Sequence, residues 1–339
     1  MNIDIIQARK KMSEIQRKSI LNSRPDICLL CQKPIARICN SHSIPQFILE
    51  NIAQDGKVYS AAATIFGEQP VFDITSGVAQ SGTFKFICRD CDNTFFSDYE
   101  KEECLLKDNI DDKSLAEIAI KNYLLEINKK YQYRESVRLV NEERPCIGNM
   151  DVLGKVVRLD IRDYLSCLSN ERLTIINNIR NYHRIICHKI LEYRVPIACQ
   201  CAIAIHRGPS GNLLLNVYDN KIKHIEMVHL CVFPLKYKTL ILLFTRRNIR
   251  PYELFSREFS RISYIDKIRY INYLIFKHTE NYFFHPKYAK FFLENAQLNA
   301  LAQELADTPN LGWISPGFSD YNPVHYREIP NFLSEEYAL

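Results

Sequence analysis

Two Cys-x-x-Cys pairs in the first hundred residues carry the clearest chemical signal in the sequence. Cys28 and Cys31 form the first pair, and Cys88 and Cys91 form the second. A turn with this spacing presents two sulfurs to one metal ion, and four thiolates suit the tetrahedral coordination of zinc. Two such pairs predict a structural Zn²⁺ site, with unrelated buried thiols as the alternative.

A histidine lies between the two pairs, in the segment Ser41-His42-Ser43-Ile44-Pro45. A near-neutral imidazole can accept a proton at cellular pH, so His42 is a candidate general base. Two other roles stay open: its ring could hydrogen-bond within the zinc module, or it could replace one cysteine as a zinc ligand.

In this order the motifs resemble the zinc-containing HNH endonuclease family, over roughly residues 25–105. The resemblance implies a treble-clef (ββα-metal) core in which His42, on a hairpin, activates water while one Mg²⁺ or Mn²⁺ holds the scissile phosphate. The chain also departs from the family. Ser41 stands where many members have an acidic or histidine metal ligand, and the family's middle asparagine and helical histidine have no match.

The helix expected after Cys91 offers substitutes for those missing ligands. Asn93, Ser97 and Glu100 would share one helical face at i, i+4 and i+7. Oxygen ligands suit Mg²⁺, so Asn93 and Glu100 join His42 as candidate catalytic residues. A helix cap and a solvated carboxylate are the alternative explanation for these two side chains.

Apolar periodicity predicts the elements that position these residues in the first half of the chain. We expect a helix over 3–21, a helix opened by Pro45, strands near 57–59 and 83–87, and a helix over about 113–130. Asp111 or Asp112 is the expected cap of that last helix.

The composition changes near residue 145, and the later part predicts a second group of elements. A turn over residues 207–212 joins two of its strands as a hairpin, which favours an antiparallel sheet. The fold class is therefore α+β, with a zinc-binding HNH-like domain over 1–140 and a larger α+β recognition or regulatory domain over 141–339. The expected helices cover 160–170, 172–193, 251–260, 264–279 and 287–305, and the expected strands cover 197–206, 213–218, 224–233 and 239–245.

A basic cluster in the second half is a candidate nucleic-acid contact. Arg246, Arg247 and Arg250 follow a strongly apolar strand and could lie along a phosphate backbone. A solvated strand end is the commoner explanation of such charge. The net charge of +5 permits a nucleic-acid partner without proving one.

These observations predict a metal-dependent HNH-type endonuclease that cuts DNA, with RNA as the alternative substrate. By analogy it would be an effector in bacterial defence or a mobile element, with the later domain recognising substrate or a protein partner. The alternative is a non-catalytic zinc module that binds nucleic acid or protein. The sequence has no apolar run of about 18 residues, so we expect no membrane partner and a cytoplasmic protein with reduced thiols.

Overall fold

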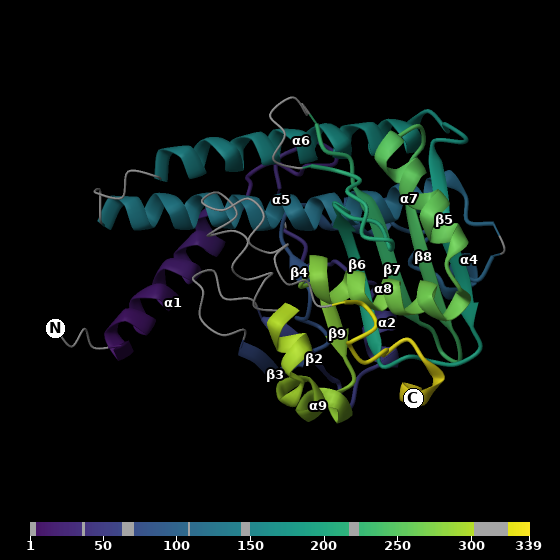
Figure 1. The fold of residues 1–339 in the computed structure, drawn as a ribbon. Coiled ribbons are helices and arrows are strands. Elements are labelled where there is room, and N and C mark those ends of the chain that lie inside the picture. Colours follow the sequence, from purple (N-terminus) through teal and green to yellow (C-terminus); the bar gives the residue numbers. More distant parts are fainter. Residues whose placement is uncertain are drawn as a thin grey trace.

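A seven-stranded antiparallel sheet forms the centre of the computed structural model, with helices on both of its faces (Figure 1). The structure describes residues 5–35, 38–62, 71–107, 109–143, 150–216, 224–301 and 325–339. The strand order is β3-β2-β9-β6-β7-β8-β5. The strands are β2 (Lys57–Ala62), β3 (Val71–Gly77), β5 (His183–Leu191), β6 (Ile197–Ile203), β7 (Val228–Pro234), β8 (Thr239–Arg246) and β9 (Tyr282–Phe284).

The central strands are apolar on both faces, because each face packs against helices. Along β7, Val228, Leu230 and Val232 belong to one hydrophobic cluster. Cys231 and Phe233, which alternate with them, belong to the other cluster. This two-sided burial explains why β7 is largely apolar rather than alternating, and each large side chain so buried contributes about 1.5–3 kcal/mol.

Two long helices, α5 (Asp112–Glu143) and α6 (Met150–Ile176), run side by side across one face of the sheet (Figure 1). Asp111 caps α5, because its Oδ1 accepts a hydrogen bond from the Ser114 amide at 2.8 Å. The helix α1 (Ile5–Asn22) contacts α5. The opposite face of the sheet is covered by α7 (Arg250–Arg261), α8 (Tyr264–His278) and α9 (Ala289–Glu294).

Several predicted elements differ from the observed ones. The helix predicted over 172–193 is wrong from residue 177 onward, because α6 ends at Ile176 and β5 begins at His183. Asn178 and Asn181 adopt positive φ angles of 49° and 58°, which end the helix and turn the chain into the strand. The isoleucines of this segment satisfied a helical period, but their branched side chains also suit a strand.

Two further expectations fail in the second half. In the described part of 213–218, the one β-bridge joins Leu213 to Arg207. The helix predicted over 287–305 is interrupted at Asn295, where α9 has already ended. The short strand β9 was not predicted, because three aromatic residues between polar neighbours give too brief a pattern.

The predicted domain boundary at residues 140 and 141 falls in the last turn of α5. Residues on both sides of it build the same sheet, since β2 pairs with β9 through Tyr59 and Phe284. One hydrophobic cluster also combines Ile48 and Leu124 with Phe244. Cutting the chain at this boundary would therefore expose part of that cluster.

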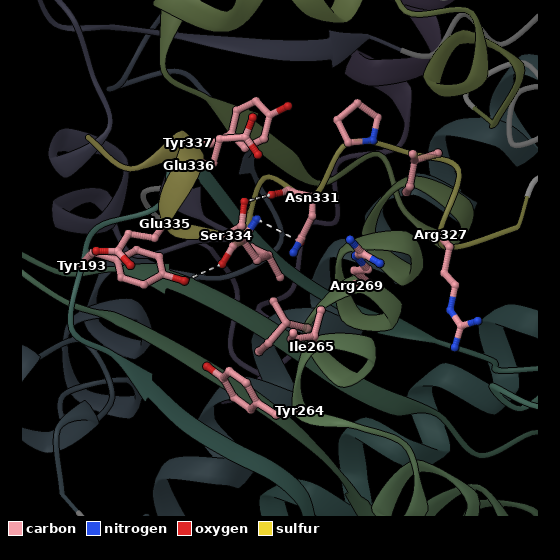
Figure 2. Close-up of a pocket in the computed structure, with 14 residues that line it drawn as sticks. Tyr193, Tyr264, Ile265, Arg269, Arg327, Asn331, Ser334, Glu335, Glu336 and Tyr337 are labelled. Carbon is pink, nitrogen blue, oxygen red and sulfur yellow. Dashed lines mark hydrogen bonds between the residues drawn. The ribbon is translucent and has the colours of Figure 1, made fainter.

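The C-terminal segment packs against α8 and leaves a shallow hollow of about 470 Å³ (Figure 2). The Tyr193 hydroxyl donates to the Leu333 carbonyl at 3.0 Å, and Arg327 pairs with Asp266. None of the predicted site residues lines this hollow. Among the helices in the described ranges, none combines the length and apolar character needed to cross a membrane.

A buried histidine joins α5 and α6 to the sheet edge. His183, at the start of β5, has a fully buried side chain between Asp112 and Glu171, each 3.0 Å from one ring nitrogen. Burial alone would lower the pKa of His183, but its hydrogen bonds with the two carboxylates raise it overall. Burial would raise the pKa of Asp112, but hydrogen bonds from His183 lower it to about 2.

These shifts predict that the contribution of Asp112 to stability depends on pH. Stabilisation by a histidine of raised pKa is present below its unfolded pKa of about 6.5 and is lost as the pH rises through the folded value. Stabilisation by Asp112 is present above about pH 3.9 and is lost as the pH falls toward about 2. Asp112→Asn should therefore lower the free energy of unfolding by about 1.5–3 kcal/mol at pH 5–6, and by less at pH 9.

Urea unfolding at the two pH values measures this difference. Asp160→Asn is the matched control, because Asp160 forms a partly exposed ion pair with Lys130. Such a pair contributes about 0–1 kcal/mol with no histidine titration between pH 5 and 9. An equal loss for Asp112→Asn at both pH values would show that His183 is uncharged in the folded protein.

Candidate metal centre and catalytic site

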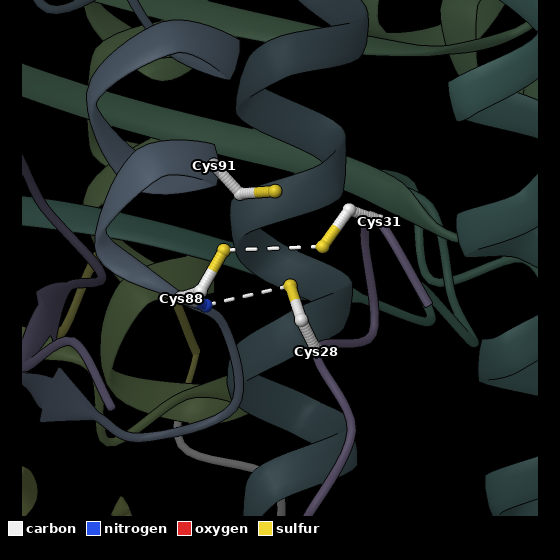
Figure 3. A group of neighbouring side chains, drawn as sticks. All are labelled: Cys28, Cys31, Cys88 and Cys91. Atoms are coloured by element: carbon white, nitrogen blue, oxygen red, sulfur yellow. Dashed lines mark hydrogen bonds between the residues drawn. The ribbon is translucent and has the colours of Figure 1, made fainter. Parts of the chain in front are cut away.

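Four cysteine sulfurs converge in the first third of the chain (Figure 3). The Sγ atoms of Cys28, Cys31, Cys88 and Cys91 all lie within 4.8 Å of one another. The Cys31 and Cys88 sulfurs are 3.9 Å apart, which is close to the sulfur separation around a tetrahedral ion with Zn–S bonds of about 2.3 Å. This set of ligands could hold a structural metal ion such as zinc.

Local hydrogen bonds shape both halves of this centre. The first pair lies in a tight turn, where the Gln32 amide donates to the Cys28 carbonyl at 2.9 Å and Gln32 adopts a φ of 59°. The second pair lies at the start of α3 (Arg89–Phe95), with Cys88 as the residue before the helix and Cys91 in its first turn. The Cys88 amide also points at the Cys28 sulfur at 3.4 Å, as expected where an amide offsets thiolate charge.

His42 lies on a two-stranded antiparallel ladder beside the four cysteines. The strand β1 (Ser41–His42) pairs with β4 (Thr83–Phe84), and His42 stands opposite Thr83. The His42 side chain is partly exposed, and its Nε2 lies 3.1 Å from the Val78 carbonyl. His42 therefore is not among the four clustered ligands, and its ring remains partly open to solvent.

The neighbouring residue anchors this ladder to the central sheet. The Ser43 hydroxyl donates to Asn281 Oδ1 at 2.9 Å, and Asn281 in turn donates to the Gln200 carbonyl. The Ser43 amide donates to the Gly82 carbonyl at 2.8 Å. Gly82 has a φ of 63°, and a Cβ there would lie 2.8 Å from the Ser43 hydroxyl, so only glycine fits this approach.

Oxygen atoms from β1, α3 and the turn after α3 converge on one buried ammonium group. Lys121 of α5 has a side chain only 1% exposed. Its Nζ donates to the Ser41 hydroxyl at 2.8 Å and to Asp92 Oδ1 at 2.9 Å, and it lies 3.1 Å from Glu100 Oε1. The Ser41 hydroxyl also donates to Asp92 Oδ1 at 2.6 Å. We call Ser41, Asp92, Glu100 and Lys121 the ammonium cluster.

The two carboxylates of this cluster respond differently to their surroundings. Burial would raise the pKa of Asp92, but the charge of Lys121 and hydrogen bonds from Ser41 and Lys121 lower it overall. Burial raises the pKa of Glu100 more than Lys121 lowers it. Cys39 donates to Asp92 at 3.2 Å, and burial together with that hydrogen bond raises the pKa of the thiol to about 12. Asp92 is thus the firmly ionised partner of Lys121.

The structure separates the two acidic or amide candidates that the sequence placed on one helical face. Glu100 reaches the ammonium cluster and is close enough to His42 for their charges to interact. Asn93 is exposed on α3, and no described contact joins it to the cluster. The expected shared face does not form, because α3 ends at Phe95 and Glu100 lies in the turn that follows.

Sequence reasoning missed Asp92 and Lys121. Asp92 directly follows Cys91, where an acidic residue in the first turn of a helix has an ordinary explanation in the helix dipole. Lys121 lies four residues after Glu117 on α5, a spacing typical of a solvated ion pair. The one available signal was the apolar run Ile118-Ala119-Ile120 directly before this lysine, which indicates a buried helix.

The three arginines of the basic cluster do not share one environment. Arg246 pairs with Glu226, and the Arg247 Nε donates to the His183 carbonyl at 2.8 Å. Arg250 is exposed at the start of α7. Their contact with nucleic acid stays a prediction.

The fold and site together define a mixed helix-and-sheet protein with an antiparallel sheet and a four-cysteine cluster that could hold a metal ion. Comparison with protein-family models, with curated proteins and with solved structures finds no match to this chain.

Removing one cysteine of the cluster should release metal. Zinc bound by four thiolates supplies folding free energy, so Cys88→Ser should lose about one equivalent of zinc per chain and destabilise the first third of the protein. Elemental analysis and thermal unfolding measure the two effects. Cys104→Ser is the control, since Cys104 is half-buried but lies outside the cluster. Folded wild-type protein without zinc would refute the site.

Removing the buried ammonium should leave two carboxylates facing each other without a counter-charge. Breaking a buried pair costs about 3–5 kcal/mol, and the partial exposure of Glu100 places Lys121→Met near the lower end, at about 3 kcal/mol at pH 7. Lys113→Met, two turns earlier on α5, removes a lysine that is 46% exposed and should cost about 0–1 kcal/mol. Urea unfolding compares the two, and similar losses would contradict the structural role of Lys121.

Proposed function

We propose that this protein is an HNH-type endonuclease that hydrolyses phosphodiester bonds in nucleic acid, DNA rather than RNA. The observation that carries the proposal is the position of His42. It lies partly exposed on the β1–β4 ladder, whose two strands are flanked in the chain by the two cysteine pairs. A turn bearing two cysteines, a short antiparallel ladder and a helix start bearing two more support the treble clef that the resemblance implies, although α2, β2 and β3 lie between the two strands of the ladder.

In this proposal His42 accepts the proton of the attacking water. Its Nε2 contacts the Val78 carbonyl, so that nitrogen carries the proton in the neutral ring, and Nδ1 is left as the acceptor. Zinc bound by the four cysteines would fix the position of the β1–β4 ladder, on which His42 lies.

The divalent cation implied by the resemblance, Mg²⁺ or Mn²⁺, does not fit the described residues as they stand. The hydroxyl and carboxylate oxygens are of the right chemical type, since Mg²⁺ prefers oxygen ligands. Those oxygens already surround the ammonium of Lys121, however, which supplies the positive charge between them. A divalent cation at this place would have to displace the lysine, and we derive no catalytic step through it.

The buried ammonium favours a second candidate function, a zinc-binding module that binds nucleic acid or protein without cutting. Lys121 is only 1% exposed, so its charge cannot touch a phosphate of the substrate. Phosphodiester hydrolysis needs positive charge at the phosphate, and in this candidate the Lys121 ammonium does not supply it. The structural zinc would then serve the fold alone.

Cleavage assays with the purified full-length chain distinguish the two candidates. Plasmid DNA and RNA are each incubated with Mg²⁺, with Mn²⁺ or with a chelator. If His42 is the base, His42→Ala should lower the cleavage rate by about 10²–10⁴-fold while zinc content and thermal stability stay unchanged. His325→Ala, an exposed histidine in the C-terminal segment, is the control that should cut normally.

The other outcomes of these assays would contradict the catalytic role of His42 or the endonuclease proposal. Unchanged cleavage by His42→Ala would dismiss its catalytic role, and loss of zinc would make it a structural support of the metal centre. Wild-type protein that binds nucleic acid but cuts neither substrate under any condition would favour the non-catalytic module.

A further inference from the structure

A second group of metal-binding side chains lies on α6 and the segment before β7. Cys167 Sγ lies 3.3 Å from His224 Nε2, and His224 Nε2 lies 3.5 Å from Glu226 Oε1. All three ligand atoms are within 4.8 Å of one another. Bonds to zinc of about 2.3 Å for sulfur and about 2.0–2.1 Å for nitrogen and oxygen give tetrahedral edges of about 3.6 Å and about 3.3 Å. The sulfur–nitrogen separation of 3.3 Å and the nitrogen–oxygen separation of 3.5 Å each lie within about 0.3 Å of the corresponding edge.

Regular backbone geometry brings the three side chains to one place. Cys167 is buried on the face of α6 that also carries Asp163, one turn earlier. His224 and Glu226 are two positions apart in the segment that leads into β7, and in an extended chain this spacing places side chains on the same side. The backbone of that segment is fixed by α7, because the Glu226 carbonyl accepts a hydrogen bond from the Tyr252 hydroxyl at 2.6 Å.

The surroundings of these three residues have the form found around bound metal ions. His224 Nδ1, the ring nitrogen away from Cys167, lies 3.8 Å from Asp163 Oδ2. A carboxylate behind a ligating histidine fixes the ring and raises its basicity. Glu226 is held in turn by an ion pair with Arg246. The histidine and glutamate are 31% and 14% exposed, which leaves a path for an ion to enter.

We propose that Cys167, His224 and Glu226 bind one zinc-type divalent transition-metal ion, at a site separate from the four-cysteine centre. A thiolate and an imidazole select zinc or a similar ion over Mg²⁺ and Ca²⁺. The thiolate supplies one negative charge to the ion, and Glu226 Oε1 shares its charge between the ion and Arg246. Three protein ligands leave a fourth coordination position for water or another small ligand. The ion would also join α6 to the segment that leads into β7.

Zinc stoichiometry of the full-length protein tests the proposal. Protein equilibrated with zinc in a chelator buffer is expected to hold two equivalents per chain, measured by elemental analysis. His224→Gln should hold one equivalent, Cys88→Ser should hold one, and the double variant none. His325→Gln, an exposed histidine elsewhere, should keep both. Asp163→Asn should keep the site but weaken its zinc affinity by about 10–100-fold, because Asp163 acts only through His224.

Cobalt provides a second readout that separates ligation from folding. With the four-cysteine centre already filled by zinc, Co²⁺ bound at this site should give the charge-transfer absorption of a single thiolate, which Cys167→Ser removes. Because His224 is partly exposed, His224→Gln is expected to fold normally even where Cys167→Ser does not. If wild-type and His224→Gln proteins bind equal amounts of zinc and Co²⁺, the proposal is overturned, and Cys167 and His224 are then only hydrogen-bond partners.

Discussion

One buried ammonium group organises the contacts beside the four-cysteine cluster and the strand that carries His42. A lysine side chain that is 1% exposed must find opposite charge and hydrogen-bond acceptors, because an unpaired buried cation costs several kcal/mol. Lys121 finds them through Ser41, Asp92 and Glu100, and so fixes the strand β1 that carries His42. Of the two oxygen ligands that the sequence offered for a divalent cation, Glu100 faces this ammonium, while Asn93 lies outside the cluster. The two candidate functions differ in whether a phosphodiester bond can be hydrolysed at a site where a lysine ammonium, rather than a divalent cation, lies between the oxygens.

The helix α5 transmits that constraint to the rest of the fold. Its first residue, Asp112, accepts hydrogen bonds from the amides of Asn181 and His183, which fixes the start of β5. Directly after Lys121, the Asn122 side-chain amide contacts the Cys201 carbonyl of β6 and the ring of His229 on β7. Burial lowers the pKa of His229 to about 3, so this histidine is a neutral hydrogen-bond partner. The same helix thus contacts β1, the central strands β6 and β7, and the edge strand β5, and fixes their relative positions.

The sequence alone predicted those features that depend on local spacing. The two Cys-x-x-Cys pairs identified the four clustered ligands, because each pair is confined to one turn and presents both of its sulfurs to the same point. Apolar runs found the central strands β6, β7 and β8, since burial on both faces leaves a continuous apolar segment. The helices α5, α7 and α8 were also predicted from the local spacing of their apolar residues, although the predicted α5 was too short.

The tertiary structure alone decided which polar residues meet. Lys121 and Asp92 each have an ordinary surface explanation in sequence, and only the packing of α5 against β1 and α3 brings them together as an ion pair with a buried lysine. The second group of metal-binding side chains likewise comes from α6 and from the segment before β7, and no sequence spacing relates Cys167 to His224 and Glu226. The segment over 183–191 became a strand because β8 offered an open edge for pairing, which outweighed its helical period. Contacts between distant segments are set by the free energy of the whole packed core, and no local pattern encodes them.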